Sequence, residues 1–292
     1  MSQVAPRAYL IAGSGGMLGI ALQRVLAEKG ERFVAPAEAD FDIIDPERIH
    51  RRMGEFAESL HGGERGVLVN AAAFTDVERA EDEPDLAYLV NERGAANLAR
   101  AAAGRELAFV HVSTDFVFNG RKHSPYTEDD EPDPLSVYGA SKLAGDRAVF
   151  VEHPGALVTR TAWAFGQGGA SFPAKILSAA REGRVLRVVD DESGSPTFTY
   201  DLARGIVGLV EAKASGLFNL AGAGSCSRFE LARATLDLAG LGDVPVEPVS
   251  SHAFVTKAER PAYSVLDCSK AADLGVFMRD WRDALAQFVG ES

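Results

Sequence analysis

The sequence predicts an α/β protein in which a doubly wound parallel sheet is followed by a smaller C-terminal α/β lobe. Short apolar runs alternate with longer helical patterns along the first half of the chain, and a glycine cluster follows the first apolar run. After Trp163 this alternation becomes irregular, with more scattered proline and glycine. Alternating strands and helices are typical of a parallel sheet covered by helices on both faces. We therefore expect a Rossmann-like domain at 1–160 and a lobe at 161–292, with segments exchanged between them.

The strands of the first half are expected where short apolar runs end in glycine or polar residues. In chain order these runs are residues 8–12, 32–35, 66–73, 107–113 and 156–161. The helices are expected where apolar residues recur at helical spacing, from Met17, from Pro46, and over 84–103 and 138–149. Pro46 suits a first helical turn, with Asp45 as the N-cap.

The second half is expected to combine short strands with amphipathic helices. Strands are predicted at 185–189 and 216–222, and helices from Thr199, over 228–240 and over 280–289.

Composition excludes several classes of function. The 292 residues are 46% hydrophobic and 25% charged, which is ordinary for a soluble globular protein. A net charge of -12 argues against binding to nucleic acid or to an anionic membrane. The sequence has neither a membrane-spanning apolar run nor the apolar segment of a signal peptide, so a cytoplasmic location is expected. Two cysteines, Cys226 and Cys268, cannot form a disulfide framework.

Three glycines, Gly13, Gly16 and Gly19, follow the first predicted strand and open the first predicted helix. Glycines at this junction permit a tight turn, close approach of a pyrophosphate and close packing of helix on strand. The amides of the helix N-terminus then bind the anion. This context favours a dinucleotide site over a tight turn without a ligand.

The choice between NADH and NADPH stays open. The second strand ends in "VAPAEAD", which contains no clear acid at its tip for a ribose hydroxyl and no nearby arginine for a 2′-phosphate. Glu38 is the closest acidic candidate.

A tyrosine and a lysine stand four residues apart in "PLSVYGASKLAGD". Tyr138 and Lys142 therefore share one helix face. Ser113, Thr114 and Asp115 end the fourth strand, at the edge of the sheet where open α/β folds bind ligands. Hydride addition to a ketone requires a proton donor, and a free tyrosine, with a pKa of about 10, is poorly matched to neutral pH. We expect the Lys142 ammonium to lower the pKa of Tyr138. A Tyr-x-x-x-Lys pair also occurs by chance, but its order after the glycine turn and "VSTD" favours carbonyl reduction.

Longer motifs resemble the dTDP-4-dehydrorhamnose reductases, a family of the extended short-chain dehydrogenase/reductase superfamily. They extend through nearly the whole chain: "GSGGMLG", "VNAAAFTDVERAEDEPDLAYLVN", "VHVSTDFVFNG", "PYTEDDEPDPLSVYGASKLAGD", "RTAWAFG", "VVDDESGSPTFTYDLAR" and "RPAYSVLD". The resemblance implies NADPH- or NADH-dependent reduction of the 4-keto group of dTDP-4-dehydro-L-rhamnose to dTDP-L-rhamnose, a precursor for polysaccharide. It also implies that residues 161–292 mainly bind the dTDP-sugar substrate. A homodimer is the candidate assembly.

The resemblance implies specific roles for residues. Tyr138 would donate the proton, Lys142 would support Tyr138 and bind the cofactor ribose, and Thr114 would hold the carbonyl. The remaining cofactor residues would be Gly13, Gly16, Met17, Leu18 and Gly19 at the pyrophosphate, Asp42 and Ile43 near the adenine, and Ala73, Phe74 and Thr75 along the nicotinamide. Asp115 and Trp163 would contact the sugar nucleotide. Arg260 is a further substrate candidate because a guanidinium suits bidentate contacts with phosphate.

Two features depart from the family pattern. Ala37 stands where many relatives carry an aspartate after the second strand, which leaves cofactor preference undecided. Some relatives are associated with magnesium, but no compact carboxylate set marks a metal site here. The acidic runs "TEDDEPD" and "VVDDES" are interpreted as solvated loops.

Other functions remain open at this stage. An epimerase or dehydratase of another nucleotide sugar is one alternative, although dehydratases usually carry an acidic pair after the threonine and here Phe116 follows Asp115. A non-catalytic NADP-binding regulatory subunit is another, since such a subunit of methionine adenosyltransferase resembles this family. The intact Thr114, Tyr138 and Lys142 favour an enzyme.

Overall fold

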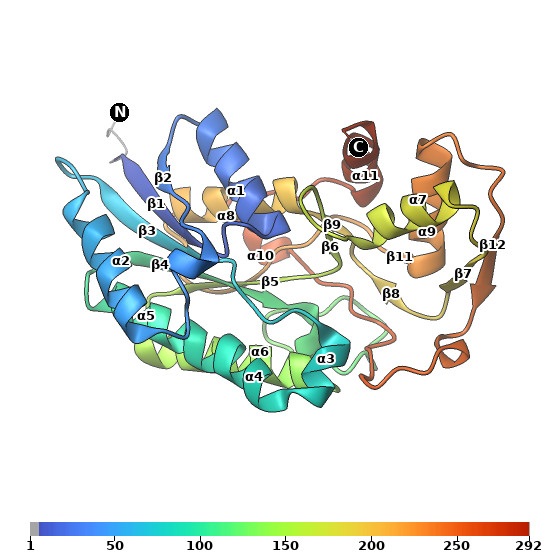
Figure 1. Ribbon diagram of the computed structural model, residues 1–292, viewed down its shortest axis with the longest axis horizontal. Helices are drawn as coiled ribbons and strands as arrows, with labels where there is room; N and C mark the ends of the chain where they lie inside the picture. The colour runs from blue at the N-terminus through green and yellow to red at the C-terminus, as the bar shows by residue number, and fades with distance from the viewer. Residues whose placement is uncertain (1–5, 292) are drawn as a thin grey trace.

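Six parallel strands form the main sheet of this computed structural model, which describes residues 6–291 (Figure 1). Their spatial order is β10-β5-β4-β3-β1-β2. The strands are β1 (Arg7–Ala12), β2 (Arg32–Val34), β3 (Arg65–Asn70), β4 (Ala108–Thr114), β5 (Leu157–Thr161) and β10 (Gly216–Asn219). The order reverses between β1 and β3, so the carboxyl edge of these strands is the point where such sheets bind ligands. The predicted doubly wound fold is confirmed.

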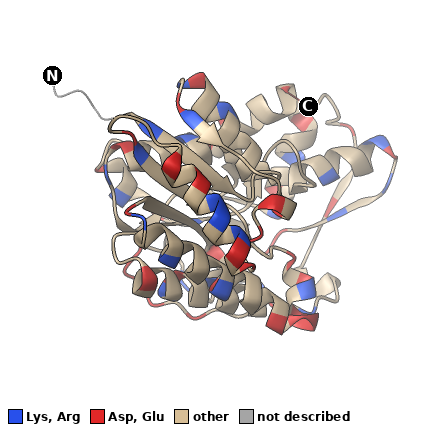
Figure 2. Ribbon diagram, turned by 60° about the vertical axis from the view of Figure 1, so that its left-hand side comes forward, with Lys and Arg blue, Asp and Glu red and all other residues tan. Residues whose placement is uncertain are grey.

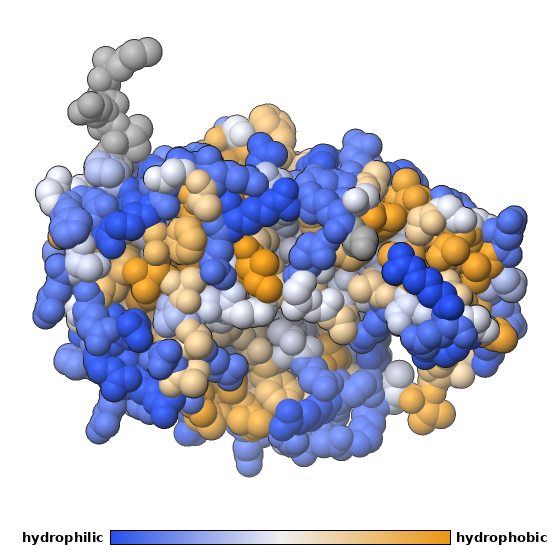
Figure 3. All heavy atoms as spheres, turned by 45° about the horizontal axis from the view of Figure 1, so that its top comes forward, coloured by the Kyte–Doolittle hydropathy of each residue, from blue (hydrophilic) through white to orange (hydrophobic). Residues whose placement is uncertain are grey.

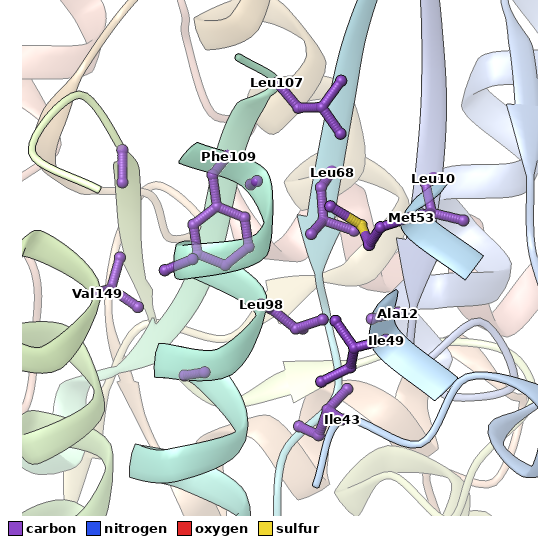
Figure 4. Packing of buried hydrophobic residues seen from close by; sticks show 14 of the residues in the cluster. Leu10, Ala12, Ile43, Ile49, Met53, Leu68, Leu98, Leu107, Phe109 and Val149 are labelled. Atoms are coloured by element: carbon purple, nitrogen blue, oxygen red, sulfur yellow. The ribbon is translucent and has the colours of Figure 1, made fainter. Parts of the chain in front are cut away.

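Helices cover both faces of the sheet (Figure 1). On one face, α1 (Met17–Glu28) and α8 (Thr199–Glu211) pack their apolar sides against the strands. On the other face lie α2 (Pro46–Glu58), α5 (Ala95–Ala103) and α6 (Val137–Glu152). Figure 4 shows this second core, in which Met53 and Leu98 from the helices meet Leu68 and Phe109 from the strands. Two buried layers thus hold the carboxyl edge of the sheet in place.

Local signals place the helix starts close to their predicted positions. The Asp45 carboxylate accepts hydrogen bonds from the amides of Glu47 and Arg48, at 3.0 and 3.1 Å, and so caps α2 as expected. Ser136 caps α6 by accepting from the Gly139 amide at 3.2 Å. The segment expected as one helix at 84–103 is instead divided into α4 (Pro84–Tyr88), a π-helical turn at Leu89–Gly94, and α5. Such a turn inserts an extra residue locally, which helical spacing in the sequence does not reveal.

Part of the second half returns to the main sheet. The sequence grouped the strand at 216–222 with the lobe, but Gly216–Asn219 pairs in parallel with β5 and forms the sheet edge. Helix α8 likewise packs on the sheet beside α1. Both elements thus come from the second half of the chain but pack with the main sheet.

The smaller lobe is built around two apolar clusters. One contains Trp281, Phe165, Phe198 and Phe288, and the other joins α7, α9 and the strand β7. Figure 1 shows these elements beside the carboxyl edge of the main sheet. The elements are β6 (Ala164–Phe165), α7 (Phe172–Arg181), β7 (Leu186–Val189), β8 (Ser193–Gly194), β9 (Thr197–Phe198), β11 (Cys226–Ser227), α9 (Arg228–Leu238), β12 (Val246–Val249) and α11 (Trp281–Gly290). The short helices α3 (Val77–Asp82) and α10 (Ser269–Ala272) complete the fold.

The molecular surface is mixed in character. Figure 2 shows Lys, Arg, Asp and Glu spread over the outer helices, while the strands are mostly uncharged. Figure 3 shows apolar side chains in separate patches between hydrophilic ones. No helix within residues 6–291 combines the length and apolar character needed to cross a membrane.

Candidate active site

A cleft of about 580 Å³ opens at the carboxyl ends of the central strands. It brings together eleven of the residues expected to bind the cofactor. These are Gly13, Gly16, Met17, Leu18, Asp42, Ile43, Ala73, Phe74, Thr75, Tyr138 and Lys142. Segments that lie far apart in the sequence, from Gly13 to Lys142, therefore converge on this cleft. They can do so because the carboxyl ends of parallel strands lie at the same edge of the sheet. Gly19 is the one predicted cofactor residue that does not line it.

The three glycines of the turn have different physical roles. Gly13 adopts a φ of +75°, which favours glycine because it has no Cβ. A Cβ on Gly19 would collide with the carbonyl oxygen of Gly13, so Gly19 allows α1 to pack closely on the turn. A Cβ on Gly16 would meet only the Gly13 oxygen, at 3.5 Å, and the start of α1 therefore remains accessible from the cleft. The turn fits an anion such as a pyrophosphate at the helix N-terminus.

Thr114 and Tyr138 lie together although they belong to different elements. The Thr114 hydroxyl lies near enough to the phenol of Tyr138 to lower the pKa of Tyr138. Thr114, which ends β4, also accepts from the Phe116 amide at 3.2 Å and donates to an Asp115 carboxylate oxygen at 3.1 Å. The ring of Phe116 packs edge-on against Tyr138, with centroids 5.5 Å apart. The predicted hydroxyl and phenol therefore meet.

The predicted effect of Lys142 on Tyr138 is wrong for this structure. Burial and the charges of Asp115 and Asp146 raise the pKa of Tyr138 while Thr114 lowers it, and the net result is a pKa of about 12. The Lys142 ammonium is instead directed to the backbone, donating to the Val112 carbonyl oxygen at 2.6 Å. Spacing along a helix predicted a shared face, but it did not reveal how much solvent the fold removes from the phenol.

Lys142 belongs to a buried polar network between β4 and α6. Its Nζ lies 3.4 Å from Nε2 of His111, whose Nδ1 lies 3.1 Å from the Asn70 side-chain amide. Burial holds the pKa of His111 well below its usual value, so the ring is neutral and suits hydrogen bonding. Burial also lowers the pKa of Lys142, to about 8, and the Asp146 carboxylate opposes that change.

Sequence reasoning missed the charged pair beneath this network. Asp146 and Arg160 are almost fully buried, and the Arg160 Nε lies 3.4 Å from an Asp146 carboxylate oxygen. Burial raises the pKa of Asp146, while the charges of Arg160 and Lys142 lower it. Asp146 lies four residues after Lys142, so helical spacing was an available signal. Arg160 lies on β5, and no local pattern connects it to α6.

The predicted substrate residues lie outside the cofactor cleft, on the side of the lobe. Asp115 is 2% exposed, and burial raises its pKa to about 6 although the Thr114 hydroxyl donates a hydrogen bond to its carboxylate. Trp163 has a φ of +45°, and its ring stacks 3.4 Å from the guanidinium carbon of Arg228. Arg228 was not among the sequence candidates.

Arg260 is already engaged by the protein. Its guanidinium forms a 2.6 Å ion pair with Glu78 and donates to the Ala258 carbonyl oxygen at 3.1 Å. Arg260 nevertheless lines a second cleft, of about 890 Å³, in the lobe.

The acidic runs form internal contacts. Asp130 accepts from the Lys122 ammonium at 2.6 Å, and Asp191 accepts from the Ser250 hydroxyl at 2.6 Å. Across residues 6–291 there is no group of three or more His, Cys, Asp or Glu side chains arranged to hold a metal ion.

The fold and the site together define a class. A glycine turn opens a doubly wound sheet, and Thr114, Tyr138 and Lys142 meet at its carboxyl edge, as in the extended short-chain dehydrogenase/reductases. The chain belongs to the family described as the RmlD substrate binding domain, whose sequence model matches residues 7–292.

Curated proteins and solved structures support this membership. The chain is 41% identical over 288 residues to dTDP-4-dehydrorhamnose reductase from Mycobacterium tuberculosis, covering 95% of this chain and 90% of the relative. It is 36% identical over 282 residues to the spore coat polysaccharide biosynthesis protein SpsK from Bacillus subtilis, covering 97% and 96%. The crystal structure of dTDP-4-dehydrorhamnose reductase from Bacillus anthracis in complex with NADP has a TM-score of 0.92 and 32% identity, covering 98% and 100%.

Proposed function

We propose that this protein reduces the 4-keto group of dTDP-4-dehydro-L-rhamnose to give dTDP-L-rhamnose, using NADPH or NADH. The observation that carries the proposal is the position of Tyr138 and Lys142 in the cleft that begins at the glycine turn, with Thr114 close to Tyr138. The reductase names of its relatives support the choice of substrate.

The cleft fits a dinucleotide. Met17 and Leu18 present the first turn of α1 to the cleft beside Gly16, where the space above the glycine is open. In this proposal they bind the pyrophosphate, Asp42 and Ile43 lie near the adenine, and the segment 73–75 borders the nicotinamide. The bound cofactor supplies the hydride. Lys142 binds its ribose.

Tyr138 supplies the proton. With a pKa of about 12 the phenol is protonated at neutral pH, so it is present in the form that an acid requires. Thr114 holds the carbonyl oxygen of the substrate beside the phenol. Tyr138 would donate its proton to the C4 oxygen of the substrate, where reduction develops negative charge. Asp115 and Trp163 border the sugar nucleotide, and the unit containing residues 161–292 supplies most of the remaining substrate contacts.

The test is oxidation of NADPH and NADH by the purified protein with dTDP-4-dehydro-L-rhamnose. Product identity is checked by chromatography against dTDP-L-rhamnose, and the Tyr138→Phe variant provides the matched control. Substrate-dependent oxidation that Tyr138→Phe abolishes supports the proposal. No oxidation, together with no binding of dTDP, would contradict it.

The alternatives predict different products. An epimerase or dehydratase would convert a nucleotide sugar without net consumption of cofactor, and a regulatory subunit would bind NADP without turnover. The proposal also includes a cytoplasmic location and a homodimer, the latter checked by light scattering of the full chain.

A further inference from the structure

The lobe cleft is cationic in an acidic protein. Among the described residues that line its roughly 890 Å³ are four permanent cations, Lys175, Arg187, Arg228 and Arg260, and two carboxylates, Glu192 and Glu259. The whole chain has a net charge of -12. A local excess of positive charge in such a chain favours an anionic ligand.

Two of the four cations are neutralised within the protein. Arg187 pairs with Glu247 at 3.4 Å, and Arg260 pairs with Glu78 at 2.6 Å. In the part of the chain that the structure describes, the Arg228 side chain has neither a hydrogen bond nor an ion pair within 4.0 Å. Lys175 also lacks such a partner there, but its side chain is exposed. Among the described residues that line the cleft, Arg228 is therefore the partly buried cation whose charge is not paired with a carboxylate.

Aromatic rings hold Arg228 in place. The guanidinium carbon lies 3.4 Å from the ring centroid of Trp163 and 5.4 Å from that of Phe172. A guanidinium that stacks through its faces keeps its edge N–H groups free for bidentate contacts with an anion. Burial lowers the pKa of Arg228 to about 10, so it stays charged at neutral pH.

Arg228 lines the lobe cleft and stacks on Trp163, which closely follows strand β5 of the main sheet. Its charge acts on Asp115, which accepts the Thr114 hydrogen bond, and on Glu192 in the lobe. In a nucleotide sugar the diphosphate is bonded directly to the sugar. A sugar held by Thr114 and Tyr138 would consequently place its diphosphate near Arg228 and its nucleoside farther into the lobe.

We propose that Arg228 binds the diphosphate of the sugar nucleotide, and that the lobe cleft receives the nucleoside. This inference rests on the proposed function. The guanidinium suits bidentate contacts with phosphate oxygens. A purely structural alternative is that Arg228 only offsets the charges of Asp115 and Glu192.

The experiment compares the binding of dTDP, dTMP and thymidine by calorimetry. The proteins are the full-length wild type, Arg228→Gln, Arg228→Lys and the control Arg184→Gln, whose guanidinium pairs with Glu182 on the surface outside the cleft. Arg228→Gln should weaken dTDP binding about tenfold to hundredfold, a scale consistent with a lost charged hydrogen bond. It should leave thymidine binding unchanged and remove most of the preference for dTDP over dTMP. Arg228→Lys should recover part of the loss, and Arg184→Gln should bind dTDP within about threefold of wild type.

Kinetics supply an independent readout. Arg228→Gln should raise the KM for the dTDP-sugar while kcat and the Kd of NADPH change little, because the diphosphate contact is the same in ground and transition states. An unchanged dTDP affinity in Arg228→Gln would overturn this inference alone. Equal loss of thymidine and dTDP binding would assign Arg228 a structural role and overturn it too. A wild-type protein that binds no dTDP and oxidises no cofactor would instead overturn the proposed function.

Discussion

The carboxyl edge of the sheet, here called the catalytic edge, and the lobe cleft differ in how their buried charges are compensated. At the catalytic edge, Lys142, Asp146 and Arg160 are almost fully buried, and the carboxylate lies between the two cations. In the lobe cleft, Arg228 is sheltered by aromatic rings but has no carboxylate within ion-pair distance among the described residues. Removing a charge from water is costly unless another charge compensates it. The protein supplies that compensation at the catalytic edge, and in our proposal the ligand supplies it in the lobe.

This difference predicts which substitutions impair chemistry, stability or recognition. At the catalytic edge, removing one charged side chain should destabilise the charged groups that it contacts in the folded protein. In the lobe cleft, removing the Arg228 charge should mainly weaken the binding of an anion.

The largest effect is expected at the phenol. Tyr138→Phe removes the proposed proton donor and should lower kcat by about two to four orders of magnitude, the usual scale of general acid catalysis. NADPH binding should change little. Tyr200→Phe is the control, since its phenol bonds to Glu28 outside the cofactor cleft. Near-wild-type kcat for Tyr138→Phe would exclude this residue as the donor.

The next effect concerns the carboxylate of the buried network. Asp146→Asn leaves Lys142 and Arg160 without their shared anion and should lower the free energy of unfolding by about 3 kcal/mol. Because Asp146 holds up the pKa of Lys142, its loss should move that pKa below about 8 and shift the alkaline limb of kcat to lower pH. Denaturant unfolding and a pH–rate profile measure the two changes.

A surface pair provides the contrast to Asp146. Asp130→Asn breaks the ion pair with Lys122, whose groups are partly exposed, and should cost less than about 1 kcal/mol. Equal destabilisation by Asp130→Asn and Asp146→Asn would contradict the distinction between buried and exposed charge.

Replacing Asp115 by asparagine should stabilise the folded protein but weaken substrate binding. Its pKa is about 6 in the folded protein, above the usual 3.8, so the folded state binds more protons and its stability falls as pH rises through this interval. A two-unit difference corresponds to about 3 kcal/mol at pH 8. Asp115→Asn should therefore stabilise the protein by up to that amount at pH 8 and by less than about 1 kcal/mol at pH 4. It should also weaken substrate binding. A stabilisation that does not vary with pH would count against the buried charge.

The smallest effect is expected in cofactor choice. The basic side chains among the described residues lining the cofactor cleft are Lys142 and Arg79, and Arg79 is paired with Glu83 at 2.8 Å. We expect kcat/KM with NADH within about tenfold of NADPH, or about 1.4 kcal/mol. Glu38→Gln should move the preference towards NADPH by a few-fold. Asp40→Asn, a neighbouring carboxylate that does not line the cleft, should leave it unchanged. A thousandfold preference for NADPH would reveal an unrecognised phosphate site.

Local patterns in the sequence determined the architecture and predicted many of the residues that line the cleft at the carboxyl edge of the sheet. Alternation of apolar runs with helical spacing predicted the parallel sheet, and the glycine spacing predicted the turn that opens α1. The four-residue spacing predicted that Tyr138 and Lys142 share a helix face, and both line the cleft. These features could be predicted from the sequence because each depends on residues that are close together along the chain.

Only the tertiary structure decided the electrostatics and the contacts between distant segments. Burial of Tyr138 reverses the expected direction of its pKa shift, because desolvation depends on everything packed around the phenol. Arg160 reaches Asp146 from β5, and Arg260 is neutralised by Glu78, which lies 182 residues away along the chain. The Arg228 side chain has no ion pair among the described residues because folding places it beside aromatic rings rather than beside a carboxylate oxygen. The spacing of residues in the sequence predicts which side chains share a face of a helix or strand. The free-energy cost of burying a charge depends instead on how much solvent is removed and on which partners the fold places beside it.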